Sequence, residues 1–151
     1  MTKDKEEILY TRYPKLFRQK DLTIQESCMP FGCECGDGWF ILLDNLCNMI
    51  DNHCRNIEEN NAWIDKDIAA GKSTNGKKKK VPNVEFGQIK EKYSGLRIYY
   101  DGGDSYIEGL VGMAEAMSYH ICEICGNQGE SGGVGWKTTL CKSCRENMEN
   151  R

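Results

Sequence analysis

The chain has 151 residues, of which 39% are hydrophobic and 28% charged, and its formal net charge is −3. This length suits one compact unit or a small domain with an appendage. The acidic balance argues against a protein that binds nucleic acid over its whole surface, because such proteins are usually basic. No stretch approaches the length of a membrane-spanning helix, and the N-terminal sequence lacks the apolar region of a signal peptide. We therefore expect a cytoplasmic protein.

The first third of the chain predicts a short lead-in followed by a long helix. Residues 1–35 are mixed, although the stretch from Lys3 to Tyr10 suits a short helix. The long helix is expected to begin at Asp37, a favoured N-cap residue, and to continue or restart through 60–70. Its apolar residues recur at helical spacing and should line one buried face: Trp39, Leu42, Leu43, Leu46, Ile50 and Ile57.

A basic loop comes next. Residues 71–82 hold glycine, serine and asparagine before the four consecutive lysines Lys77–Lys80, a composition that cannot bury a face. The first interpretation is a flexible, solvated linker. The alternative is a loop that grips phosphate.

Alternating residues over 84–93 and 96–100, with Tyr93-Ser94-Gly95 between them, predict a β-hairpin. Gly87 indicates a bulge, because the alternation changes phase there. One face should be apolar and packed: Ile89, Tyr93, Leu96, Ile98 and Tyr100. The other should be exposed and is the predicted ligand- or partner-binding face: Lys90, Lys92, Arg97 and Tyr99, with Gln88 beside them. The plainer alternative for these charges is a solvated sheet face.

A second helix is predicted over 105–121. Ser105 and Glu108 are spaced as a capping box at its start. Its apolar stripe comprises Ile107, Leu110, Val111, Ala114, Met117 and Ile121. The helix runs straight into Cys122, so the segment that follows should pack against the core.

Two Cys-x-x-Cys pairs dominate the C-terminal segment. Cys122 and Cys125 form the first pair, Cys141 and Cys144 the second, and fifteen residues separate the pairs. This spacing is typical of a zinc ribbon or knuckle, in which a tight turn presents two sulfurs to one metal. A redox role is the weaker alternative, because neither pair lies in a βαβ context. Four thiol ligands leave no open position for water, so the predicted Zn²⁺ is structural.

These elements together predict an α+β fold: a small unit of two helices and a β-hairpin, with a C-terminal zinc ribbon or knuckle. The predicted domains are a core over 1–121, which includes the flexible basic loop, and a zinc-binding knuckle over 122–151 that packs on it.

Several of these segments together resemble a family of small, mostly uncharacterised proteins encoded by bacteriophages and prophages. The matching stretches are YPKLF (13–17), CGDGWF (35–40), LC (46–47), QIKEKYSGLRIYY (88–100), AEAMS (114–118), CEICG (122–126), Trp136 and TLC (139–141). The resemblance spans most of the chain except 59–82. It implies a compact α/β unit ending in a zinc knuckle, and a viral origin, but no activity. Many similar members have a histidine near the last metal position, where this chain has Cys144.

Five cysteines lie outside the two pairs: Cys28, Cys33, Cys35, Cys47 and Cys54. A second metal site could use Cys28, Cys33 and Cys35, with Cys54 or His53 as the fourth ligand. The alternative is that these cysteines are small buried thiols, which is the ordinary explanation for Cys47 and Cys54 on one helical face.

Catalysis is not expected, because the sequence offers no phosphate-binding loop, no dinucleotide motif and no evident nucleophile with its base. Two binding hypotheses remain. In the first, a phage accessory protein binds and blocks a host target, either a defence or regulatory protein or an anionic signalling nucleotide. In the second, a local basic surface binds nucleic acid, because an aromatic side chain among cations suits base stacking and phosphate contact. The exposed hairpin face, the Lys77–Lys80 run and the ribbon residues Lys137, Lys142 and Arg145 could supply that surface. The acidic total favours the first.

Overall fold

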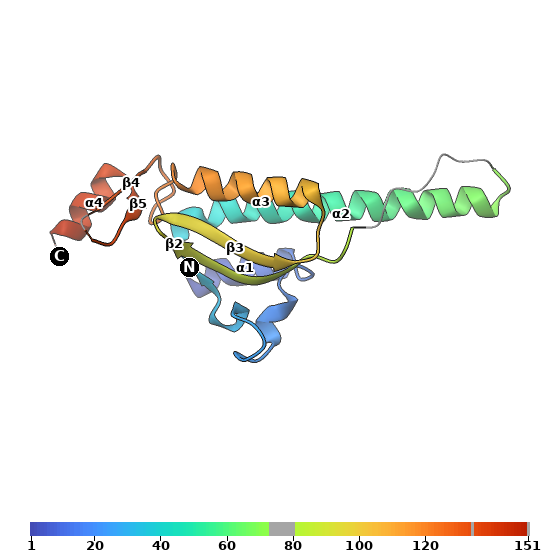
Figure 1. The fold of residues 1–151 in the computed structure, drawn as a ribbon, viewed down its shortest axis with the longest axis horizontal. Helices are drawn as coiled ribbons and strands as arrows, with labels where there is room; N and C mark the ends of the chain where they lie inside the picture. Colours follow the sequence, from blue (N-terminus) through green and yellow to red (C-terminus); the bar gives the residue numbers. More distant parts are fainter. Residues whose placement is uncertain (73–80, 134, 151) are drawn as a thin grey trace.

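A computed structural model describes residues 1–72, 81–133 and 135–150 (Figure 1). It has the predicted α+β fold. The described helices are α1 (Lys3–Arg12), α2 (Phe40–Ala69), α3 (Ser105–Ser118) and α4 (Lys142–Glu149), with short 3₁₀ helices η1 (Arg18–Asp21), η2 (Met29–Phe31) and η3 (Asp37–Trp39). The strands are β1 (Cys33–Glu34), β2 (Glu85–Lys92), β3 (Gly95–Asp101), β4 (Glu130–Gly132) and β5 (Thr138–Leu140).

All six residues of the predicted apolar stripe are buried; Trp39 lies in η3 and the other five lie in α2. Helix α2 runs without a break to Ala69, and its far half extends beyond the hairpin (Figure 1). Asp37 does not cap it, contrary to the prediction. The Asp37 carboxylate instead accepts hydrogen bonds from the backbone N–H (2.7 Å) and the hydroxyl (3.0 Å) of Thr2. It thereby fastens the start of α1 to the segment that precedes α2.

Strands β2 and β3 form the predicted antiparallel hairpin, with Ile89 opposite Ile98 and Lys90 opposite Arg97. The predicted bulge is present, because the register shifts on either side of Gly87. The sequence did not predict β1, which pairs in parallel with β2 and completes a three-stranded sheet in the order β1-β2-β3.

Helix α3 lies along β3 and α2 and closes the core (Figure 1). Its cap is Asp104 and not the predicted Ser105, because Asp104 Oδ1 accepts a hydrogen bond from the backbone N–H of Ile107 at 3.1 Å. Its predicted stripe is buried from Ile107 to Ala114, but the buried face continues at Ser118, so Met117 beside it is exposed.

The N-terminal lead-in is part of the core and not a loose arm. The backbone N–H of Phe86 donates to the carbonyl of Leu16 at 2.8 Å, and the Phe17 ring packs edge-on against Phe86. The buried Glu6 carboxylate accepts a hydrogen bond from the backbone N–H of Cys33 at 2.7 Å. These contacts join α1 and its following loop to the sheet.

Candidate metal centre and adjoining groove

The four cysteines of the two pairs lie together at one end of the molecule. The first pair follows α3 in a tight turn closed by a hydrogen bond from Gly126 N–H to the Cys122 carbonyl at 2.9 Å. The second pair begins α4, where Cys141 is the N-cap residue. The antiparallel strands β4 and β5 bring the two turns together.

The sulfur atoms are arranged as a metal site requires. All four lie within 4.8 Å of one another, and the sulfurs of Cys125 and Cys141 are 3.6 Å apart. A tetrahedral site with metal–sulfur bonds of about 2.3 Å needs sulfurs about 3.8 Å apart. The donor set therefore fits a single metal ion, and the cluster could bind one.

Local hydrogen bonds prepare two of the thiols to ionise. The Ser143 hydroxyl, followed by the Cys144 backbone N–H, lowers the pKa of Cys141 to about 6. Burial opposes ionisation of Cys122, but backbone hydrogen bonds at Cys141, Cys125 and Ile124 outweigh it and lower its pKa. A metal that binds here would displace the remaining thiol protons.

The CGDGW motif forms the surface on which the first cysteine turn sits. The backbone N–H of Gly38 donates to the Glu123 carbonyl at 2.7 Å. A Cβ atom added at Gly38 would stand 2.1 Å from the Cys122 carbonyl oxygen, and one added at Gly36 would stand 2.2 Å from the Glu123 carbonyl oxygen. The two glycines are therefore required by the close approach of two backbones.

Polar groups on both sides fix this contact. The indole N–H of the buried Trp39 donates to the Ile121 carbonyl at 2.8 Å. The Glu123 carboxylate accepts from Gly36 N–H at 2.9 Å. Burial raises the pKa of Glu123, and the Gly36 hydrogen bond opposes that rise. The segment 122–150, called the ribbon below, is thus attached to the start of α2.

A second attachment joins the ribbon to the hairpin turn through Ser94. The Ser94 hydroxyl lies 2.6 Å from that of Ser131, and the Ser94 carbonyl accepts from the Thr139 hydroxyl at 2.7 Å. Glu91 Oε1 accepts from the Ser94 backbone N–H at 2.6 Å. Ser94 is only 2% exposed; its bond to Thr139 is buried, and its bonds to Ser131 and Glu91 are partly buried.

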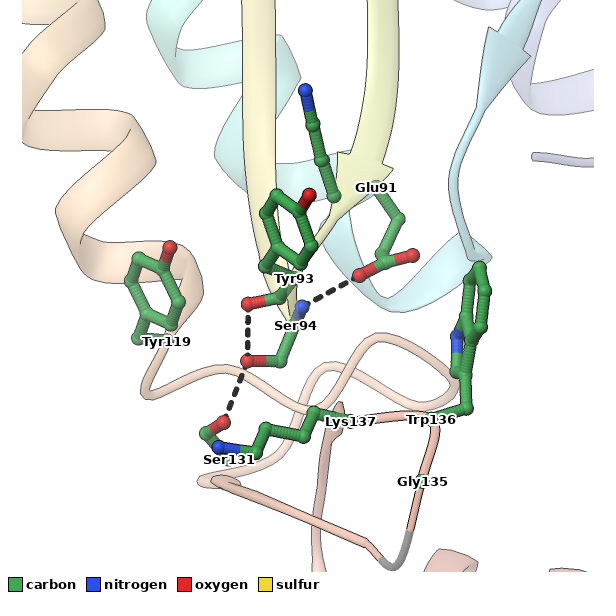
Figure 2. Close-up of a pocket in the computed structure, with 9 residues that line it drawn as sticks. Glu91, Tyr93, Ser94, Tyr119, Ser131, Gly135, Trp136 and Lys137 are labelled. Carbon is green, nitrogen blue, oxygen red and sulfur yellow. Dashed lines mark hydrogen bonds between the residues drawn. The ribbon is translucent and has the colours of Figure 1, made fainter.

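Between the turn and the ribbon lies an open groove of about 770 Å³, called the hairpin–ribbon groove (Figure 2). Its lining residues are Glu91, Lys92, Tyr93, Ser94, Tyr119, Ser131, Gly135, Trp136 and Lys137. Figure 2 shows the Glu91 side chain between those of Tyr93 and Trp136 in this view. The sequence did not predict the groove. Lys137 was considered only as part of a basic surface, and the neighbouring Trp136, an aromatic residue beside a cation in a glycine-rich loop, was not assigned to a binding site.

The predicted binding face of the hairpin is divided by the structure. Lys90 and Tyr99 stay on the open sheet face, with the Lys90 ammonium 5.4 Å from the centre of the Tyr99 ring. Lys92 lines the groove. Arg97 turns toward α3, where it donates to the Tyr119 hydroxyl at 2.6 Å and lies 4.0 Å from Glu115.

Two expectations about this hairpin need correction. Arg97 was expected to point outward from the exposed face, but it has Glu115 and Tyr119 as partners. Tyr93 was assigned to the packed face, but it is 77% exposed. Its φ of 53° places it in the turn, where strand alternation no longer applies.

The structure does not bring the other cysteines into a metal site. Among the described residues, the C-terminal four are the one group of three or more potential ligands that converge. Cys28 is exposed, Cys33 and Cys35 are buried, and Cys54 lies on α2. Burial, and then the charge of Glu6, raises the pKa of Cys33 to about 12, so this thiol keeps its proton.

The remaining site predictions fall partly outside the described residues. Lys77–Lys80 lie within the segment 73–80, which the structure does not describe. No helix of the described chain is both long and apolar enough to cross a membrane.

Comparison of the chain with protein-family models, with curated proteins and with solved structures finds no match. The resemblance to bacteriophage proteins therefore stays a prediction that rests on the quoted motifs, and the function must be argued from the site itself.

Proposed function

We propose that this protein is a non-enzymatic, zinc-stabilised binding protein that a bacteriophage uses to hold and block a target in the host cytoplasm. The observation that supports this best is the position of the four-thiol cluster. It lies in the ribbon, and the ribbon forms one wall of the hairpin–ribbon groove. The metal stabilises the wall, and the groove binds the target.

Zinc is the metal we propose for the cluster. Four sulfur ligands in a tetrahedral arrangement suit Zn²⁺ or iron. A site closed by four protein ligands has no position for a substrate, so Zn²⁺ here supplies folding free energy and no chemistry. The ribbon has little apolar burial to order it, because its buried hydrophobic residues among those described are Cys122 and Leu140.

The chemistry of the groove supports binding without catalysis. Its described lining offers one carboxylate, Glu91, and two serine hydroxyls, those of Ser94 and Ser131, that bond to each other. The described lining contains no histidine that could act as a base for either hydroxyl. A nucleophile needs an adjacent base to react at neutral pH.

The groove also indicates the kind of target. Lys92 and Lys137 line it, and neither forms a salt bridge within the described chain. The Lys92 ammonium lies 5.4 Å from the centre of the Tyr93 ring. Ammonium groups without a carboxylate partner attract an anionic ligand. The target we propose is therefore a host protein with an acidic surface or an anionic signalling nucleotide.

Nucleic-acid binding is the second candidate function. The observation that favours it is the pairing of Lys90 with Tyr99 on the open sheet face, because a cation beside an exposed aromatic ring suits a stacked base and its phosphate. An electrophoretic shift with DNA and RNA that weakens steeply with salt would support this alternative.

The direct test is a capture experiment with the full-length, metal-loaded protein. The tagged protein is incubated with host-cell extract and re-isolated, and its bound proteins and small molecules are identified by mass spectrometry. The control is a Tyr93→Ala/Trp136→Ala variant. We expect an unmodified target that the wild type retains and the variant loses. Recovery of a chemically altered target would contradict the proposal, as would equal recovery with both proteins.

A further inference from the structure

Two aromatic side chains that line the hairpin–ribbon groove are largely exposed to solvent. Trp136 is 78% exposed and Tyr93 is 77% exposed, the two highest values among the exposed large hydrophobic residues of the described chain. Both line the same groove although 43 positions separate them in the sequence (136 − 93). Exposed aromatics gathered at one concave site are a mark of ligand binding.

The backbone of Tyr93 has a conformation that is unfavourable for tyrosine. Tyr93 and Ser94 both have positive φ, 53° and 67°, as a type I′ turn requires. Asn-Gly is the favoured pair for this turn, and each non-glycine residue in the left-handed region is unfavourable. The hydrogen bonds of Ser94 to Glu91, Ser131 and Thr139 hold the turn in this conformation.

The polar groups around these rings define a ligand with two chemical ends. Lys92 and Lys137 are suited to an anion. Glu91 is suited to hydrogen-bond donors, because one of its oxygens accepts from Ser94 and the other has no hydrogen-bond partner in the described chain. A bare phosphate would be repelled by Glu91. A nucleotide with amino or imino N–H groups on its base satisfies both ends and offers a flat face to the aromatic rings.

We infer that the hairpin–ribbon groove binds a small nucleotide of one or two bases, an inference that rests on the proposed function and names its target. The base stacks against Trp136 and Tyr93, its N–H edge faces Glu91, and its phosphate lies near Lys92 and Lys137. Guanine suits Glu91 best, because its imino N–H and its amino group lie side by side on the Watson–Crick edge and can both donate to a carboxylate. Uracil has a single imino N–H between two carbonyl acceptors.

The size and charge of the groove favour a small nucleotide over a long strand. Its volume of about 770 Å³ lies in the usual range for small-molecule sites. A long strand needs a continuous basic track, but the chain has a net charge of −3 and this groove contains a carboxylate.

The test is calorimetric titration of the full-length, zinc-loaded protein with GMP, the dinucleotide GpG, UMP and inorganic phosphate. We expect GMP or GpG to bind at least about tenfold tighter than UMP, and phosphate alone not to bind measurably. Trp136→Ala and Tyr93→Ala should each weaken binding about fivefold or more, the effect of losing one stacking contact. Glu91→Gln should reduce the preference for GMP over UMP.

Matched controls lie outside the groove. Trp63→Ala removes another exposed tryptophan, and Tyr99→Ala removes the other tyrosine that has a lysine 5.4 Å from its ring. Both should leave the dissociation constant within about twofold of wild type. Circular dichroism and zinc content of every variant establish that its fold is intact.

Several results would overturn the inference. Absence of GMP and GpG binding at millimolar concentration would do so, as would wild-type affinity in the Tyr93→Ala/Trp136→Ala variant. If a single-stranded oligonucleotide binds far tighter than GpG, with a steep salt dependence, the ligand of the groove is a nucleic-acid strand and not a small nucleotide. If no nucleotide binds but a host protein is still captured, the inference fails and the proposed function stands. If GMP or GpG is recovered hydrolysed, the non-enzymatic function fails.

Discussion

The α-carbon of Gly38 lies against the backbone of Cys122, so that an added Cβ atom would stand 2.1 Å from the Cys122 carbonyl oxygen. This contact joins the start of the long helix to the first turn of the metal centre. It gives the CGDGW motif a structural role, and it makes the metal centre part of the same packed structure as the core.

Replacement of Gly38 by alanine should therefore destabilise the protein. The added methyl group would collide with the Cys122 carbonyl and displace the first cysteine turn. Such overpacking typically costs about 1–3 kcal/mol of unfolding free energy. Urea unfolding of the zinc-loaded protein measures the change. The matched control is Gly109→Ala on α3, where an added Cβ meets nothing within 4 Å. That change should be neutral or stabilising by up to about 1 kcal/mol, because alanine favours helix. Equal stability of the two variants would show that the Gly38 contact is not close.

Tyr93→Asn should raise stability while it weakens ligand binding. Asparagine tolerates the left-handed conformation of a type I′ turn better than tyrosine, a difference of about 1 kcal/mol. The loss of the ring removes a stacking surface from the groove. Thermal unfolding and GMP titration give the two readouts. Tyr99→Asn is the control, and it should destabilise, because asparagine is unfavourable within a strand. A Tyr93→Asn protein less stable than wild type would argue against strain at this turn.

Arg97→Ala and Lys90→Ala should differ, although the two residues lie opposite each other in the hairpin. Arg97 donates to the Tyr119 hydroxyl at 2.6 Å, and its loss should cost about 1 kcal/mol of unfolding free energy. Lys90 forms no salt bridge among the described residues and is part of an open face, so Lys90→Ala should change stability by less than about 0.5 kcal/mol. Denaturant unfolding measures both. If the two variants are equally stable, the Arg97–Tyr119 contact contributes nothing.

The buried cysteines of the core should behave as inert thiols. Burial raises the pKa of Cys33 to about 12 from an ordinary value of 9.0. Its neutral form is therefore favoured by the fold. The contribution of the buried Cys33 thiol to the free energy of unfolding is complete below pH 9 and decreases as the pH rises from 9 toward 12. Alkylation of the native protein at pH 8, followed by peptide mass spectrometry, should label the exposed Cys28 far faster than Cys33. Equal labelling would contradict this assignment.

The elements with strong local patterns could be predicted from the sequence. Helical spacing from Trp39 to Ile57 predicts the buried face of α2, and alternation predicts the hairpin and its bulge at Gly87. The spacing of the cysteine pairs predicts the group of thiols that the structure brings together. In each case the physical cause lies within one element or in the geometry of one metal ion.

The features that sequence reasoning missed depend on contacts between distant segments. The two-residue strand β1 exists because β2 lies beside it, and no local pattern marks it. Arg97 bends toward Tyr119, 22 positions away, instead of pointing into solvent. The groove arises only when the ribbon packs beside the hairpin turn, so Trp136 and Tyr93 could not be connected in advance.

The central claim is that one zinc ion, held by Cys122, Cys125, Cys141 and Cys144, stabilises the ribbon wall of the binding groove. Native mass spectrometry of the purified protein, with inductively coupled plasma analysis of the same sample, tests it most directly. We predict one zinc per chain in the wild type and in Cys28→Ser, and none in Cys125→Ser. A wild-type chain that is folded through its C-terminal ribbon but carries no metal, or carries iron in place of zinc, would contradict the account.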